Sequence, residues 1–115
     1  MAPMMASVAR VPVRGSDSNQ RWRVRLAGDA KISFLCSPNN PTGTVTPPVD
    51  IEEILAGIDG VLFLDNAYVE FCDTDYLPLL AVHENLVIGR TMSKAYALAG
   101  ARIGYAFAPA WISNP

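Results

Sequence analysis

Three short segments of this chain are apolar at successive positions rather than at every second one. They are residues 32–36 (ISFLC), 61–64 (VLFL) and 86–89 (LVIG), and stretches long enough for a helix separate them. Strands of this kind are typical of parallel sheets whose two faces are both covered by helices. The pattern therefore predicts an α/β fold, and 115 residues allow at most one domain.

Other segments of the sequence predict additional strands and helices. We expect strands at residues 8–13 and 103–107, a helix at 49–58 and a short helix at 76–82. For the helix at 49–58, Thr46 is the predicted N-cap and Pro47 the predicted first residue, with Gly57 near its end.

Polar residues follow each of the three apolar strands. Residues 37–43 read SPNNPTG after the first strand, Asp65 and Tyr68 follow the second, and residues 90–94 (RTMSK) follow the third. Ligands of open parallel sheets bind beyond the carboxyl ends of the strands. The three loops therefore predict a site at one edge of the sheet.

The charges are distributed unevenly along the chain. Apart from Asp17 and Asp29, every acidic residue lies between positions 32 and 89, whereas residues 90–115 carry only Arg90, Lys94 and Arg102. This basic stretch predicts an anion site. A net charge of −2 gives no argument for nucleic acid or an anionic membrane as a partner.

Composition also bounds the location of the chain. No apolar run approaches the roughly 20 residues of a membrane span, and residues 1–6 lack the basic start of a secretory signal. Cys36 and Cys72 are too few for a disulfide framework and are expected to be buried thiols. We therefore expect a cytoplasmic protein, and we assign no metal ligands.

Lys94 is the predicted reactive group of the site. It lies among small and apolar residues, with no acid nearby in the sequence and with Arg90 and Arg102 close to it. Neighbouring cations and apolar surroundings favour the neutral amine that attacks an aldehyde. Arg102 offers a bidentate fork for a phosphate, and Thr91 and Ser93 add hydroxyl groups. A lysine beside a phosphate site indicates pyridoxal phosphate as the cofactor.

Three further residues suit that cofactor. A carboxylate at the ring nitrogen keeps a pyridinium protonated, and Asp65 ends an apolar strand where such a group is needed. Tyr68 and Asn40 are candidates to hydrogen-bond the phenolic oxygen of the ring. Each of these residues alone is more commonly a turn or core residue, but together with Lys94 they form a consistent set.

Three ordered motifs carry a family resemblance: SPNNPTG at 37–43, DNAYVEF at 65–71 and RTMSKAYALAGARIGY at 90–105. They resemble the class I/II, fold-type I aminotransferases, and within that family the histidinol-phosphate aminotransferase branch. The resemblance covers about residues 31–112. It implies that Lys94 binds pyridoxal phosphate covalently and moves the substrate proton. It also implies that Asp65 holds the ring nitrogen, that Tyr68 and Asn40 contact the phenolic oxygen, and that Thr91, Ser93 and Arg102 hold the phosphate.

The resemblance also implies a domain arrangement. Residues 31–115 would form the central part of a mostly parallel-sheet large domain, truncated at both ends, and residues 1–30 a poorly defined segment. The small domain would be absent, and with it the arginine for the substrate carboxylate. In the family the reaction moves an amino group between glutamate and imidazole acetol phosphate, in a homodimer. This piece alone is expected to be marginally stable and inactive.

Two departures and three alternatives accompany this interpretation. Asn66 stands where the family usually has glutamate, and Ala97 where it often has glycine. Ala97 places a methyl group where a close backbone approach is needed. The alternatives are a threonine-phosphate decarboxylase, an aromatic aminotransferase, and a non-catalytic remnant or interaction fragment.

Overall fold

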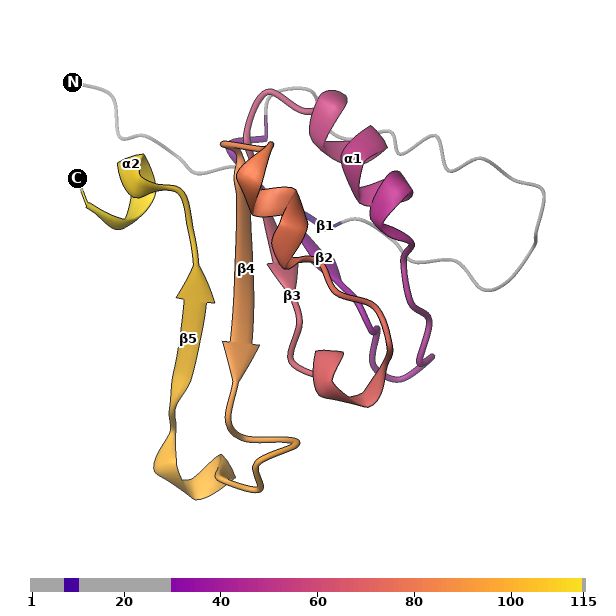
Figure 1. Ribbon diagram of the computed structural model, residues 1–115, viewed down its shortest axis with the longest axis vertical. Helices are drawn as coiled ribbons and strands as arrows, with labels where there is room; N and C mark the ends of the chain where they lie inside the picture. The colour runs from indigo at the N-terminus through magenta and orange to yellow at the C-terminus, as the bar shows by residue number, and fades with distance from the viewer. Residues whose placement is uncertain (1–7, 11–29, 115) are drawn as a thin grey trace.

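The computed structural model describes residues 8–10 and 30–114, and its central feature is a sheet of five strands (Figure 1). The strands follow one another across the sheet in chain order. They are β1 (Val8–Arg10), β2 (Ile32–Cys36), β3 (Val61–Asp65), β4 (Leu86–Thr91) and β5 (Gly104–Phe107).

Strands β1 to β4 are parallel, as the uninterrupted apolar runs predict. The register of β2 and β3 runs from Ile32 opposite Val61 to Cys36 opposite Asp65. β4 continues two residues past the predicted Gly89, to Thr91. The carboxyl ends of β2, β3 and β4 therefore lie at one edge of the sheet, where the three polar loops begin.

Strand β5 runs antiparallel to β4, a direction that the sequence did not predict. The chain reverses through residues 92–103, and the Met92 amide donates to the Ile103 carbonyl oxygen across the base of this loop at 3.1 Å. Because no helix crosses back over the sheet between the two strands, the antiparallel direction is the one the short connection permits.

The helix predicted at 49–58 is α1 (Pro48–Ala56). The predicted N-cap was wrong: Pro47 occupies that position, and no side chain caps the helix. Thr46 instead uses its backbone amide and carbonyl in bonds to Ser37 and Tyr76. The short helix predicted at 76–82 is a 3₁₀ helix, η2 (Leu77–Ala81), and a second one, η1 (Val69–Phe71), follows β3.

The core lies on one face of the sheet. Leu35, Leu62, Leu64 and Ile88 project from the strands into a cluster that α1, η1 and η2 cover. On the opposite face Phe34 and Phe63 stack at 5.4 Å, and Phe34 remains 37% exposed. Within the described residues, the sheet is thus covered on one face, and the predicted second layer is not seen.

Several predictions fall on other parts of the chain. Val8–Arg10 is a strand as predicted, whereas residues 11–13 and most of the segment 1–30 lie outside the described residues. Cys36 and Cys72 are half-buried rather than buried. Across residues 8–10 and 30–114, the structure contains no helix long and apolar enough to span a membrane.

Candidate active site

Tyr68 is the meeting point of side chains from three loops at the carboxyl edge of the sheet. The Asn40 side-chain amide, from the loop after β2, donates to the Tyr68 hydroxyl at 3.2 Å. The Lys94 Nζ, from the loop after β4, lies 5.6 Å from the centroid of the Tyr68 ring. The structure thus brings together three residues that the sequence assigns to one site, from positions 28 and 26 residues apart.

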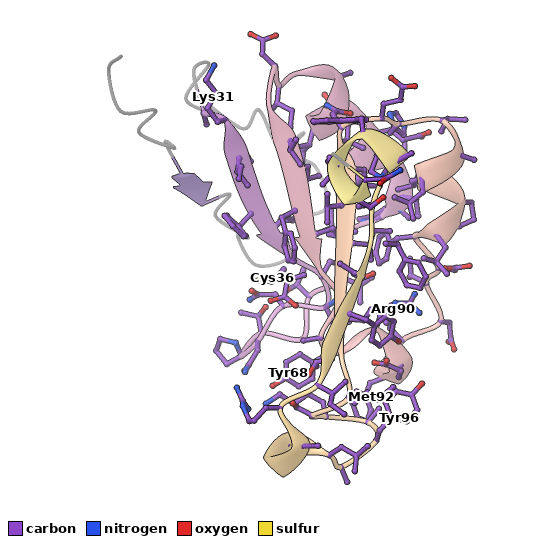
Figure 2. All side chains as sticks on the ribbon, turned by 90° about the vertical axis from the view of Figure 1, so that its left-hand side faces the viewer. Lys31, Cys36, Tyr68, Arg90, Met92 and Tyr96 are labelled. Carbon is purple, nitrogen blue, oxygen red and sulfur yellow. The ribbon has the colours of Figure 1, made fainter. Side chains whose placement is uncertain are left out.

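Figure 2 shows Lys31 far from Tyr68. Tyr68 lies with Met92 and Tyr96 at the lower end of the strands, whereas Lys31 lies at the opposite end, where β2 begins. Because Lys31 and Lys94 are the only lysines in the sequence, Lys94 is the lysine available at the carboxyl edge.

Asp65 ends β3 at the same edge and is half-buried. Its Oδ1 accepts the Ala67 amide at 2.9 Å, which fixes the side chain in a turn. Its Oδ2 lies 3.9 Å from the Cys36 Sγ, at the end of the neighbouring strand β2. The carboxylate is therefore held in one orientation by its own loop.

Thr91 and Ser93 lie together at the end of β4. The Ser93 amide donates to the Thr91 Oγ1 at 3.0 Å, and the Thr91 hydroxyl donates to the Ile103 carbonyl oxygen at 3.4 Å. Arg102 is exposed and donates to the Ala99 carbonyl oxygen at 3.3 Å. Among the described residues, no hydrogen bond joins Arg102 to Thr91 or Ser93.

The loop that carries Lys94 differs from the apolar setting that the sequence suggested. Lys94 and the residues from 95 to 104 are exposed. Neither of the two ion pairs found within residues 30–114 includes Lys94. Two residues of this loop have left-handed backbone conformations, Ala97 with φ 55° and Arg102 with φ 54°. The family's frequent glycine at position 97 thus corresponds to a backbone that favours glycine.

Sequence reasoning missed a buried polar cluster beneath the Asn40 loop, which we define as residues 37–46. Ser37 and Tyr76 are fully buried, and their hydroxyl oxygens are 2.7 Å apart. The Tyr76 hydroxyl donates to the Thr46 carbonyl oxygen at 2.6 Å, and the Thr46 amide donates to the Ser37 Oγ at 2.8 Å. Burial raises the pKa of Tyr76, a shift that the Ser37 hydrogen bond opposes. The only sign of this cluster in the sequence was the presence of Tyr76 in an otherwise apolar segment.

Asn66 is a second buried residue with an unexpected contact. It is fully buried, and its side-chain amide donates to the Ser37 carbonyl oxygen at 2.7 Å. Its Oδ1 has no hydrogen-bond partner among the described residues. Asn66 therefore ties the start of the Asn40 loop to the end of β3.

A cavity of about 300 Å³ opens beside the Asn40–Tyr68 pair. Its lining includes Asn40, Val45, Tyr68, Phe71 and Cys72. The wall is mostly apolar, and its polar groups include the side-chain amides of Asn39 and Asn40 and the Tyr68 phenol. Small-molecule sites commonly have this composition.

Comparison with known proteins identifies what this arrangement is similar to. The family described as aminotransferase class I and II matches residues 19–114. Over 83 residues the chain is 70% identical to histidinol-phosphate aminotransferase of Methanoculleus marisnigri, which covers 72% of this chain and 24% of the relative.

Solved structures agree in fold. Histidinol-phosphate aminotransferase from Sinorhizobium meliloti, in complex with pyridoxal-5'-phosphate, matches with a TM-score of 0.62 and 36% identity, over 70% of this chain and 23% of that one. L-threonine-O-3-phosphate decarboxylase from Porphyromonas gingivalis matches with a TM-score of 0.62 and 33% identity, over 69% and 25%. This chain spans about a quarter of the length of the proteins it matches.

Proposed function

Because this chain belongs to the class I and II aminotransferases, a family that depends on pyridoxal phosphate, we propose that it provides the cofactor-binding edge of a histidinol-phosphate aminotransferase. The reaction is amino transfer between glutamate and imidazole acetol phosphate. The 70% identity to a histidinol-phosphate aminotransferase supports this choice within the family. The observation that carries the proposal is the meeting of Asn40, Tyr68 and Lys94 at one edge.

The chemical groups at this edge fit the cofactor. An exposed amine suits its aldehyde, a fixed carboxylate its ring nitrogen, a paired phenol and amide its phenolic oxygen, and hydroxyls with a guanidinium its phosphate. When bound, pyridoxal phosphate supplies a ring that accepts the electron pair left when the substrate loses its Cα proton.

Each residue then has a separate role. The Lys94 Nζ would hold the aldehyde carbon of the cofactor, with release of water, and once the substrate amine has displaced it, it would move the proton between the substrate Cα and that carbon. Asp65 keeps the ring nitrogen protonated, because its turn hydrogen bond fixes the carboxylate. Asn40 orients the Tyr68 hydroxyl toward the phenolic oxygen. Thr91, Ser93 and Arg102 hold the phosphate.

The proposal extends to the surroundings of the site. Residues 31–115 form part of a cofactor-binding large domain in this interpretation, and the substrate carboxylate is bound by a small domain outside this chain. A second subunit completes a homodimer, the substrates are small amino and keto acids, and the location is the cytoplasm. The quarter-length match to the relatives supports the need for additional polypeptide.

The test starts from the two lysines. We expect addition of pyridoxal phosphate to the chain to give the visible absorption band of a lysine-bound cofactor. Borohydride reduction should then fix the cofactor mass on the peptide that contains Lys94. Lys94→Ala should lose the band, whereas the matched control Lys31→Ala, at the far end of β2, should keep it. A band that survives in Lys94→Ala would contradict the assignment.

Substrate assays distinguish the alternatives. The match to a threonine-phosphate decarboxylase at 33% identity makes decarboxylation of threonine phosphate the second candidate reaction. Amino transfer from glutamate to imidazole acetol phosphate supports the leading proposal, and transfer to aromatic keto acids supports an aromatic aminotransferase. A cofactor band without turnover is the expected result for this piece alone, so a non-catalytic remnant is supported only if a longer polypeptide that includes the small domain also gives no turnover.

A further inference from the structure

We infer that Tyr76 is a positioning residue, whose hydroxyl closes a buried hydrogen-bond ring that fixes both ends of the Asn40 loop and thereby holds Asn40 against Tyr68. The ring itself is a feature of the fold. The effect of this hydrogen-bond ring on a bound cofactor rests on the proposed function of the Asn40–Tyr68 pair.

The directions of the hydrogen bonds in this ring follow from its chemistry. A carbonyl oxygen only accepts, so the Tyr76 hydroxyl proton points to the Thr46 oxygen at 2.6 Å. The Ser37 hydroxyl must then donate to the Tyr76 oxygen at 2.7 Å, and it accepts from the Thr46 amide at 2.8 Å. Each hydroxyl therefore both donates and accepts, and no alternative proton arrangement satisfies all three bonds.

The ring joins the two ends of one loop. Ser37 directly follows β2, and Thr46 stands two residues before α1 begins. The Ser37 amide also donates to the Asp65 carbonyl oxygen at 3.0 Å, and its carbonyl accepts from Asn66. Both ends of the loop are thus fixed to β3 and η2, while Asn40 at its exposed tip makes the bond to Tyr68.

The tyrosine hydroxyl, rather than its ring, makes this connection. The ring of Tyr76 packs in the apolar core, where a phenylalanine would fit equally well. Without the hydroxyl, the fully buried Ser37 hydroxyl and the half-buried Thr46 carbonyl would each lose a partner, which is costly. The loop would escape this cost by moving outward, and Asn40 would move with it.

The first test measures the loop without any cofactor. In Tyr76→Phe we expect hydrogen exchange at the amides of Asn39, Gly43 and Thr46 to quicken about tenfold relative to the amides of β3, the effect of one lost buried hydrogen bond. The control is Leu79→Ala, on the 3₁₀ helix that directly follows Tyr76, which removes a buried side chain with no hydrogen bond to the loop. Equal relative exchange in Tyr76→Phe and Leu79→Ala would overturn the inference.

The second test uses the visible band of the bound cofactor and its pH midpoint. If Tyr76 acts through Asn40, Tyr76→Phe and Asn40→Ala shift the midpoint in the same direction, and the double variant shifts no further than Asn40→Ala. Leu79→Ala should leave the midpoint unchanged. Additive shifts in the double variant would overturn the link to Asn40. If the unsubstituted chain gives no band, the proposed function fails, and loop exchange alone decides whether the ring holds the loop.

Discussion

Two loops at the same edge of the sheet are held in different ways. The Asn40 loop is closed at its base by the buried ring of Ser37, Tyr76 and Thr46, and is tied to β3 through Asn66. The Lys94 loop, residues 92–103, is exposed over most of its length and is held mainly by backbone hydrogen bonds within itself. One loop receives its shape from side chains distant in the sequence, and the other from local turns.

This difference bears on how the site is assembled. The part proposed to contact the aromatic ring of a cofactor is organised by the core of this chain. The part that carries Lys94 has no comparable support within the described residues, so under the proposed function a bound cofactor and additional polypeptide would contribute more to it. We expect substitutions under the Asn40 loop to affect stability and those in the Lys94 loop to affect mainly binding.

The largest predicted contrast compares two leucines. Leu64 of β3 is fully buried in the core cluster against which Val45 of the Asn40 loop packs, whereas Leu98 in the Lys94 loop is 44% exposed. Leu64→Ala should lower the free energy of unfolding by about 2–5 kcal/mol, because it removes core packing and leaves a cavity. Leu98→Ala should change it by less than about 0.5 kcal/mol. Urea unfolding measures both, and equal effects would remove the distinction between the loops.

A second contrast compares two glycines. A Cβ at Gly89 in β4 would lie 2.4 Å from the Phe63 ring, whereas a Cβ at Gly100 would meet nothing within 4 Å. Gly89→Ala should therefore cost about 1–3 kcal/mol of unfolding free energy, since the ring must leave its place beside Phe34.

Two controls make this contrast specific. Gly100→Ala should change stability by less than about 0.5 kcal/mol. Combining Gly89→Ala with Phe63→Leu should cost less than the sum of the two single changes, because the smaller side chain leaves room for the new methyl group. Additive costs in urea unfolding would show that the Phe63 ring is not the obstacle.

The regular part of the fold was predictable from local sequence. The bounds of β2 were predicted to the residue, because a short apolar run there meets turn-forming residues at both ends. The direction of β5 was not predicted, because it depends on the loop 92–103, which reverses the chain and does not cross back over the sheet. The start of α1 was misjudged because Thr46, a common N-cap residue, is occupied by tertiary contacts.

The site was predictable to the extent that the sheet determines it. Asn40, Tyr68 and Lys94 come together because parallel strands end at a common edge. The surroundings of Lys94 were misjudged, because small apolar neighbours in sequence do not cover a side chain in a loop that projects from the sheet. The hydrogen-bond ring through Tyr76 could not be predicted, because Ser37 and Thr46 lie 39 and 30 residues from Tyr76 in the sequence. Two of its hydrogen bonds also use the backbone of Thr46.

A third prediction concerns the backbone of the Lys94 loop. Ala97 has φ 55°, a conformation that costs an L-residue about 1–2 kcal/mol, whereas glycine loses about 0.5–1 kcal/mol in conformational entropy on folding. Ala97→Gly should therefore stabilise the chain by about 0.5–1 kcal/mol. Ala95→Gly, whose backbone has no positive φ, should be neutral or slightly destabilising. Urea unfolding measures both variants. Stabilisation of Ala97→Gly alone indicates relief of local backbone strain, whereas equal changes in both variants indicate a general effect of glycine.

The smallest predicted effect compares how tyrosines under the Asn40 loop and in the Lys94 loop contribute to the pH dependence of stability. Burial raises the pKa of Tyr76 above the ordinary tyrosine value of 10.0, so the folded chain keeps this proton at a pH where the unfolded chain releases it. The contribution of the neutral hydroxyl is therefore fully present below pH 10 and is lost as the pH rises from there through the folded-state value. Tyr76→Phe should flatten this alkaline loss, whereas Tyr96→Phe, in the exposed Lys94 loop, should retain it. An identical alkaline loss in all three proteins, measured by urea unfolding between pH 8 and 11, would contradict the coupling of Tyr76 proton release to unfolding.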